Sequence, residues 1–265
     1  MRMDRVSWVK VEEYLRSSPT KDTVLLAVGS LENHGKHMPL GTDTLIPDRI
    51  LELIEERSEV MIAPTIPYGA TDYLMGFPGT VSLGTEGLIQ VLRAITDCLY
   101  RYGFRRFIIL NGHGGNKKAI ETVGVELHNR GAWLAEMDWW LQAGELHPEW
   151  KDGHGGGEET AGVLAVDPSL VDPQWLQEGQ NLKNDATDAF PTQGFHSVCY
   201  QGASVILPRE VHHYSDNGWI ARLAPTQATE EWGREMLQTM ADYYAAFIRE
   251  FSRIPLPEPK HNAST

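Results

Sequence analysis

Cysteine is nearly absent from this sequence: Cys98 and Cys199 are the only two, and they lie far apart. Such a pair offers neither a disulfide framework nor a cysteine metal site, so we expect a reducing compartment, the cytoplasm. No apolar run approaches the roughly 20 residues of a membrane span. Residues 1–15 lack the apolar core of a secretion signal. These absences predict a soluble, cytoplasmic protein.

Basic residues are also scarce, with 23 Lys and Arg against 36 Asp and Glu, a net charge of -13. Nucleic-acid binding needs clustered basic residues that neutralise phosphates, so this class is excluded. The 265 residues, 42% of them hydrophobic, can bury the core of one large α/β domain. We expect that domain over residues 1–253, and a Pro-rich polar tail outside the core over residues 254–265.

Short apolar runs typical of buried strands alternate with amphipathic segments typical of helices. The predicted strands are residues 23–29, 60–63, 107–110 and 133–137, and the predicted helices are residues 43–56, 88–102, 117–129, 158–166 and 225–251. This alternation predicts an α/β fold with a mostly parallel sheet and helices on both faces. Residues 168–224 lack such periodicity and are expected to form long loops with one or two short strands, one of them at 204–207.

Carboxylates and imidazoles follow three of the predicted strands. Glu32, His34 and Asp43 follow the first, His113 follows the third, and the segment HGGGEET at 154–160 comes after the fourth. The carboxyl ends of parallel strands meet at one edge of a sheet, where sites form in such folds. An isolated Glu-x-His is usually a solvated loop, and His113 alone is as readily structural as a ligand. Together they predict a metal site with N and O ligands, which suits Zn, Mn, Fe or Ni.

The glycine-rich turns invite a different reading, a doubly wound nucleotide-binding protein. Neither turn is followed by the Gly-Lys-Ser/Thr of a phosphate loop, and neither matches the dinucleotide pattern after the first strand. This hypothesis therefore lacks its phosphate-binding signal.

Four motifs occur in the order found in one family: GSLENHGKHMPLGTD at 29–43, FPGT at 77–80, NGHGGN at 111–116 and HGGGEET at 154–160. On these motifs the sequence, from about residue 5 to 250, resembles the creatininase (creatinine amidohydrolase) family. The resemblance implies a three-layer α/β/α sandwich, two divalent metal ions and a homohexamer. It also implies hydrolysis of a non-peptide C–N bond, in a cyclic amide or formamide.

The resemblance also implies roles for individual residues. Glu32 and His113 would bind one metal ion, His34 would bind the other, and Asp43 would bridge the two. The ions, expected to be Zn, Mn or Fe, would hold a bridging hydroxide that attacks the amide carbon.

The last carboxylate ligand is assigned less directly from the resemblance. In creatininase itself a Glu in the turn after the third strand is a ligand, but Gly115 occupies that place here. The resemblance then points to the later motif, where we choose Glu159 over its neighbour Glu158. The missing Tyr-Glu pair after His113 counts against creatinine as the substrate, as does Leu74, where relatives often carry a His before FPGT.

Protonation of the departing nitrogen is assigned to His154, with Glu158 as the alternative. Trp139, Trp140 and Trp150 are expected to wall the substrate pocket, because creatininases place tryptophans before this motif. The partner would be a small amide, whether creatinine, a formamide or a peptide-like bond, with no nucleic acid and no membrane. A catalytically inactive metal-binding scaffold or sensor of the same fold is the alternative function.

Overall fold

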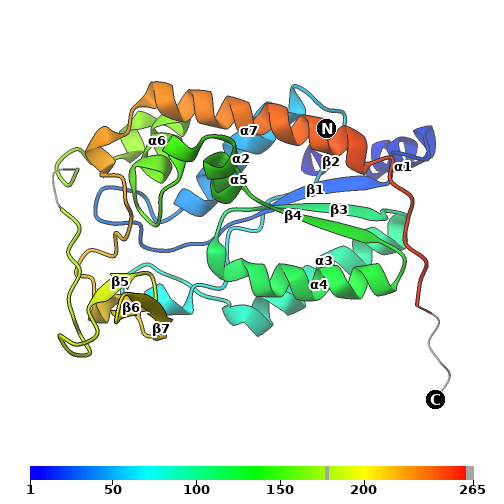
Figure 1. Cartoon of the computed structure of the whole chain (residues 1–265). Helices are drawn as coiled ribbons and strands as arrows, with labels where there is room; N and C mark the ends of the chain where they lie inside the picture. Colours follow the sequence, from blue (N-terminus) through cyan, green and yellow to red (C-terminus); the bar gives the residue numbers. More distant parts are fainter. Residues whose placement is uncertain (177–178, 261–265) are drawn as a thin grey trace, which may run out of the picture.

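A computed structural model describes residues 1–176 and 179–260 of the chain. Its central sheet has four parallel strands: β1 (Thr23–Val28), β2 (Met61–Ile62), β3 (Arg106–Asn111) and β4 (Trp133–Asp138). Their order across the sheet is β2-β1-β3-β4 (Figure 1). The predicted parallel sheet is therefore confirmed.

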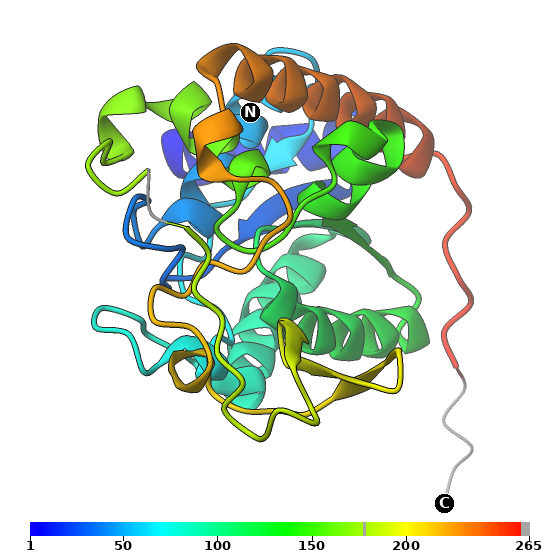
Figure 2. The ribbon, with the colours of Figure 1, turned by 60° about the vertical axis from the view of Figure 1, so that its left-hand side comes forward.

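Helices cover both faces of this sheet, as Figures 1 and 2 show. One side carries α2 (Thr42–Glu55), α5 (Trp139–Leu146), α6 (Gly157–Val166) and α7 (Glu230–Phe251), and the other carries α1 (Trp8–Ser17), α3 (Gly84–Tyr102) and α4 (Lys117–Asn129). The result is the three-layer α/β/α architecture that the sequence predicted.

The side chains of β1 show why a continuous apolar strand suits this position. Leu25 and Ala27 enter the core cluster beneath α2 and α7, while Val24, Leu26 and Val28 enter the cluster beneath α3 and α4. All five are fully buried. A strand buried on both faces must be apolar throughout rather than alternating.

Strands β1, β3 and β4 end level with one another. Val28 pairs with Asn111 at one joint, and Asn111 pairs with Asp138 at the next. Each of the three strands has six residues, and their starts are level as well. The chain therefore leaves three neighbouring strands at the same height, which gathers the loops that follow them at one edge of the sheet.

Several elements differ from the sequence-based expectation. Helix α5 occupies part of the segment expected to be a loop between residues 137 and 154, and α1 was not predicted. Helix α7 begins at Glu230 rather than residue 225, because the Thr229 side chain caps it by accepting from the Trp232 N–H. Helix α3 begins at Gly84 and ends, as expected, at Tyr102, where it is capped by Gly103, whose φ of 119° suits glycine.

The segment between residues 168 and 224 contains a small antiparallel sheet of β5 (Thr192–Gly194), β6 (Ser197–Tyr200) and β7 (Ala203–Ile206). The single strand predicted at 204–207 corresponds to β7. This sheet, drawn in yellow, lies towards the end of the molecule where β1, β3 and β4 exit (Figures 1 and 2).

The described part of the predicted tail, residues 254–260, runs beside β4 and α4. The Trp133 Nε1–H donates to the Pro255 carbonyl at 2.8 Å, and the Lys260 N–H donates to the Asn129 carbonyl at 3.0 Å. Residues 261–265 of that tail lie outside the described residues. Within the described ranges, no helix is both long and apolar enough to cross a membrane.

Candidate metal centre

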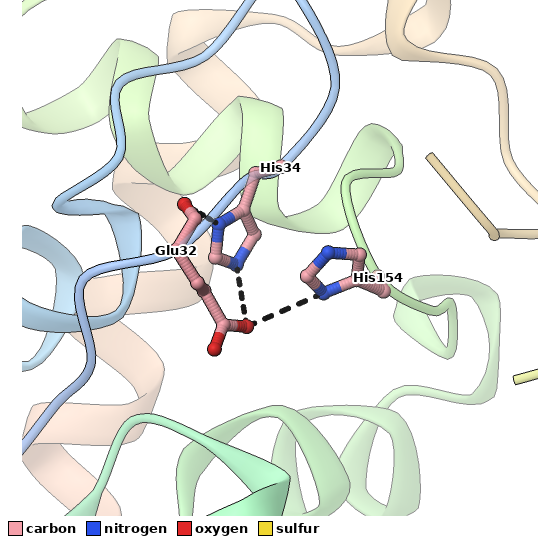
Figure 3. Close-up of side chains that lie close together, drawn as sticks. All are labelled: Glu32, His34 and His154. Carbon is pink, nitrogen blue, oxygen red and sulfur yellow. Dashed lines mark hydrogen bonds and ion pairs between the residues drawn. The ribbon is translucent and has the colours of Figure 1, made fainter. Parts of the chain in front are cut away.

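The carboxylates and imidazoles predicted from the sequence meet at the carboxyl edge of the sheet. Three overlapping groups have ligand atoms within 4.8 Å of one another: Glu32, His34 and His154; Glu32, Asp43 and His113; His34, Asp43 and Glu159. Figure 3 shows the first group, with both imidazoles directed towards the carboxylate. The loop after β1, the turn after β3 and the start of α6 each contribute.

Asp43, in the first turn of α2, connects two of these groups. Its Oδ1 lies 2.9 Å from Nε2 of His34, and its Oδ2 lies 3.1 Å from Nδ1 of His113. Glu32 Oε1 lies 3.1 Å from the same His113 nitrogen. Glu159 Oε2 lies 3.7 Å from His34 Nε2. Asp43 thus faces one group with each oxygen, the arrangement expected of a carboxylate shared by two cations.

The three histidine rings are each fixed by a backbone carbonyl. Nδ1 of His34 lies 3.2 Å from the Glu32 carbonyl, Nε2 of His113 lies 3.1 Å from the Ala70 carbonyl, and Nε2 of His154 lies 2.7 Å from the Asn33 carbonyl. A carbonyl only accepts, so each of these nitrogens carries the hydrogen. In the neutral ring, the opposite nitrogen then directs a lone pair at the carboxylates.

Lone pairs facing lone pairs need a positive charge between them. Glu32 is fully buried, and neither of its carboxylate oxygens has a well-aligned hydrogen-bond partner among the described residues, despite the short distance to His113. A buried, unpaired carboxylate costs several kcal/mol unless a proton or a metal ion compensates it. The donor set of imidazole nitrogens and carboxylate oxygens fits divalent transition metals.

The pKa values of these side chains also show that the centre favours positive charge. Burial opposes a charge on His34, but the carboxylates of Asp43 and Glu159 outweigh it and raise its pKa to about 10. His113 likewise has a pKa well above its usual value, because Glu32 and Asp43 outweigh its burial. Burial also opposes ionisation of Asp43, yet His34 and His113 hold its pKa well below the usual range. The centre attracts cations strongly, and without metal it takes protons.

The two neighbouring carboxylates of α6 have different surroundings. Glu159 Oε2 accepts from the Gly155 N–H at 2.7 Å and belongs to a ligand group. Glu158 is buried, and its Oε1 has no hydrogen-bond partner among the described residues. Burial, then the charges of Glu159 and Asp152, raise its pKa well above the usual value. Glu159 is thus the better placed of the two for a metal, and Glu158 for carrying a proton.

His154 lies closer to the ligand groups than the sequence indicated. Its Nδ1 is 3.7 Å from Glu32 Oε1, and its ring centroid is 4.4 Å from that of His34. Burial, then the nearby His34, lower its pKa to about 4, so its resting ring is neutral at pH 7. The geometry gives His154 two possible uses, as a proton carrier and as a metal ligand.

Two supporting side chains were not identified from the sequence. Ser30 donates its hydroxyl hydrogen to Asp43 Oδ2 at 2.7 Å. Asn116 accepts from the Ala70 N–H at 2.9 Å and donates to the Gly29 carbonyl at 3.0 Å, which ties the loop carrying Ala70 to the end of β1. Both residues belong to the recognised motifs, which is the signal that could have found them.

A cavity of about 810 Å³ opens above the centre. Asp43, His113, His154, Glu158 and Glu159 contribute to its floor. Its walls include Leu74, Trp140, Phe195 and Ile220.

The three tryptophans predicted to wall the pocket lie in different surroundings. Trp140 lines the cavity. Trp139 and Trp150 are buried in the hydrophobic core cluster that includes α7, with Trp150 stacked on His147. Successive residues of α5 differ by about 100° in direction, so Trp139 is buried in this cluster, whereas Trp140 packs against it and also reaches the cavity.

Fold and centre together define a class: an α/β protein with a candidate metal site at the carboxyl edge of a parallel sheet. Residues 4–248 match the protein family Creatininase, described as creatinine amidohydrolase. The chain belongs to the creatininase family.

The names of the matched relatives point to different substrates. The chain is 32% identical to the creatinine amidohydrolase of Pseudomonas putida over 68% of its own length and 78% of the relative. It is 34% identical to the mycofactocin precursor peptide peptidase of Mycolicibacterium smegmatis, over 56% of the chain and 59% of the relative. It is 25% identical to the 3-dehydro-scyllo-inosose hydrolase of Thermotoga maritima, over 86% and 77%. The matches are hydrolases of different substrates.

Solved structures agree with the fold. A crystal structure of creatinine amidohydrolase (creatininase) superposes with a TM-score of 0.74 and 25% identity, covering 94% of this chain and 97% of that one. A creatininase structure designated Mn matches with a TM-score of 0.73 and 26% identity, covering 96% and 99%. A mutant creatininase of Zn-Zn type matches with a TM-score of 0.71 and 26% identity, covering 96% and 98%.

Proposed function

We propose that this creatininase-family hydrolase is a metal-dependent amidohydrolase that cleaves a non-peptide C–N bond, in a cyclic amide or a formamide. The observation that carries the proposal is the convergence of three imidazoles, those of His34, His113 and His154, on buried carboxylates. A purely structural core would not gather these side chains, because each buried, unpaired charge destabilises the fold.

We assign two divalent ions, Zn, Mn or Fe, to the ligand groups that share Asp43. Glu32 and His113 would hold one, His34 and Glu159 the other, and Asp43 both. When bound, the ions would supply Lewis-acid polarisation of an amide carbonyl and activation of water at neutral pH. Relatives solved in Mn and Zn-Zn forms support the choice of metal class.

Proton transfer is assigned to His154, through Nδ1. The Asn33 carbonyl fixes the hydrogen on Nε2, so the neutral Nδ1 facing the floor can accept the proton that the attacking water loses. It can then deliver that proton to the departing nitrogen. Glu158 is the alternative donor, because burial raises the pKa of its carboxyl group well above the usual value. Its Oε1 has no hydrogen-bond partner among the described residues, and Glu158 lines the cavity.

Two measurements test this function. Elemental analysis of protein purified without chelator should find transition metal, up to two ions per chain. The metal-loaded protein should hydrolyse members of a panel of cyclic amides and formamides, and chelation should abolish that turnover. Metal without any hydrolysis would favour the inactive scaffold or sensor, and a metal-free, inert protein would contradict both functions.

The oligomeric state is a separate proposal. The family resemblance favours a homohexamer, and light scattering coupled to size-exclusion chromatography should then give six times the 29.7 kDa chain mass. A monomeric mass would contradict it and leave the proposed chemistry in place.

A further inference from the structure

The opening of the cavity differs in chemistry from its floor. Apart from Gly114 and Gly115, which follow His113, the solvent-exposed lining residues mark the opening: Tyr73, Leu141, Gln180, Gln193 and Arg222. Among the described residues that line the cavity, Arg222 is the one lysine or arginine. The floor carries the ligand groups assigned to metal ions and the opening carries a guanidinium, so the two ends of a bound molecule meet different chemistry.

The guanidinium of Arg222 is held in place without a carboxylate partner among the described residues. Its Nε and Nη2 donate to the Lys151 carbonyl at 3.2 and 2.6 Å. Its own N–H donates to Asp152 Oδ1 at 2.8 Å. No ion pair of Arg222 occurs among the described residues, and no hydrogen bond there uses its Nη1. The guanidinium is therefore ordered in advance, which reduces the entropy lost when it binds a ligand, and its charge is not neutralised.

Gln180 adds a second donor beside it. Its Oε1 accepts from the N–H of Ala221, the neighbour of Arg222, at 3.2 Å. An amide whose oxygen is used in this way offers its NH₂ hydrogens to a ligand. An amide donor next to an unpaired guanidinium is a combination that recognises a carboxylate.

Hydrogen bonds connect the segment that carries Arg222 to the loop that carries Asp152 and His154. Asp152 Oδ1 also accepts from the Leu223 N–H at 2.7 Å, and the Ile220 N–H donates to the His154 carbonyl at 2.8 Å. The cation at the opening thus has a fixed position relative to the floor. Leu74, Trp140, Phe195 and Ile220 provide apolar wall between the two.

We propose that the substrate is an amide that carries a carboxylate and an apolar side group, of the N-acyl amino acid class, with Arg222 and Gln180 binding the carboxylate. This inference rests on the proposed amidohydrolase function and narrows its substrate class. The scissile amide lies at the floor, beside the ligand groups and His154, so the carboxylate of the same molecule lies towards the opening, where Arg222 and Gln180 lie. A cavity of about 810 Å³ has the size of sites for drug-sized ligands, and a small cyclic amide alone would leave most of it empty.

The test compares N-formyl-L-phenylalanine with N-formyl-L-phenylalaninamide, which differ only in the carboxylate, on the metal-loaded protein. The wild type should show kcat/KM about 10-fold or more higher for the carboxylate, the contribution of a charge-assisted hydrogen bond. Arg222→Ala should remove that preference, and Arg222→Lys should retain part of it. Arg234→Ala, which removes an exposed arginine of α7, is the matched control and should keep the full preference.

Equal rates for the two compounds, or a preference that survives Arg222→Ala, would overturn the inference and leave the amidohydrolase function intact. Turnover of neutral amides but of neither formyl compound would also overturn it. If the protein hydrolyses no amide at all, the proposed function fails. Equilibrium dialysis of the same two compounds then decides the anion subsite by itself: Arg222-dependent preference for the carboxylate supports it, and equal or absent binding overturns it.

Discussion

His34 and Asp43 face each other in the candidate metal centre, with Nε2 of the imidazole 2.9 Å from Oδ1 of the carboxylate. His34 comes from the segment that joins β1 to α2 and Asp43 from the first turn of α2, and each side chain has a second partner that holds it. The Glu32 carbonyl orients the ring of His34, and the Ser30 hydroxyl donates to Asp43. Through Asp43 this pair connects the group of His34 and Glu159 with the group of Glu32 and His113. Metal binding should therefore be most sensitive to substitutions at this pair.

The first prediction concerns Asp43. Asp43→Asn removes the charge that serves both ligand groups, so metal content and turnover should fall together while the fold persists, because the sheet is built by other residues. Elemental analysis and circular dichroism on the same sample measure this. Glu52→Gln, an exposed change on the same helix, is the control and should change neither. Full metal occupancy with normal turnover in Asp43→Asn would exclude the bridging role.

The second prediction separates the two neighbouring carboxylates of α6. Glu159→Gln should weaken binding of one metal ion, because Glu159 is the carboxylate placed in a ligand group. Glu158→Gln should keep both ions. Each variant is first freed of metal with a chelator. Calorimetric titration with Zn²⁺ then gives the number of ions bound per chain. The reverse pattern would transfer the ligand role to Glu158.

The third prediction concerns His154. His154→Ala should retain its metal ions and slow C–N cleavage by about 10²–10⁴-fold, the usual contribution of a positioned acid–base group. Substrates with better leaving groups should suffer less, since their nitrogen needs less protonation in the transition state. The measurement is kcat across a leaving-group series beside metal content. Loss of a metal ion would show that His154 is a ligand, and a wild-type rate would give the proton transfer to Glu158 or to water.

The fourth prediction uses the two adjacent tryptophans of α5. Trp139 is buried in the core, so Trp139→Ala should lower the free energy of unfolding by about 3–5 kcal/mol. Trp140 lines the cavity, so Trp140→Ala should chiefly raise KM. Urea denaturation and steady-state kinetics on both variants distinguish them. Similar stability losses without a change in KM would show that both residues serve the core.

The fifth prediction concerns pH and Tyr14, which joins α1 to the sheet. Its hydroxyl donates to the Thr23 carbonyl at 3.3 Å and accepts from the Met61 N–H at 3.2 Å. Tyr14→Phe leaves that buried N–H unpaired and should cost about 1–3 kcal/mol of unfolding free energy at pH 7.

Burial raises the pKa of Tyr14 to about 12, above its usual value of 10.0. The neutral hydroxyl is therefore the form favoured by folding, and its contribution is complete below pH 10 and lost as the pH rises through 12. The difference in unfolding free energy between wild type and Tyr14→Phe should shrink over that interval. A difference independent of pH would contradict the assignment.

Much of the fold could be predicted because the elements that build it are long and periodic. The buried strands and helices α2, α4 and α7 have apolar residues at spacings that few other structures accommodate. Helix α5 has only eight residues, and its paired tryptophans favoured a pocket wall over a helix. The β5–β7 sheet has short, partly exposed strands without a continuous apolar run.

At the site, the sequence indicates which side chains converge but not how they are oriented. The carbonyls of Ala70 and Asn33 fix two of the imidazoles, and a backbone carbonyl leaves no trace in residue identity. Glu158 and Glu159 are equivalent as letters, whereas on a helix they diverge by about 100° and reach different surroundings. His154 appeared to be only a proton donor because its distance from Glu32 depends on how α6 packs.

The level ends of β1, β3 and β4 constrain how this molecule can change. Each residue of a strand advances the chain by about 3.3 Å and reverses the face of its side chain. One residue added within β3 would therefore carry His113 away from Asp43 and Glu32 and expose part of the core. The lengths of these three strands are therefore constrained by the site. The long connection that carries β5–β7 and Arg222 does not belong to this sheet, and the constraint does not apply to its length. The residues that this connection contributes to the cavity can therefore change in evolution to suit a new substrate, while the ligand groups at the floor stay the same.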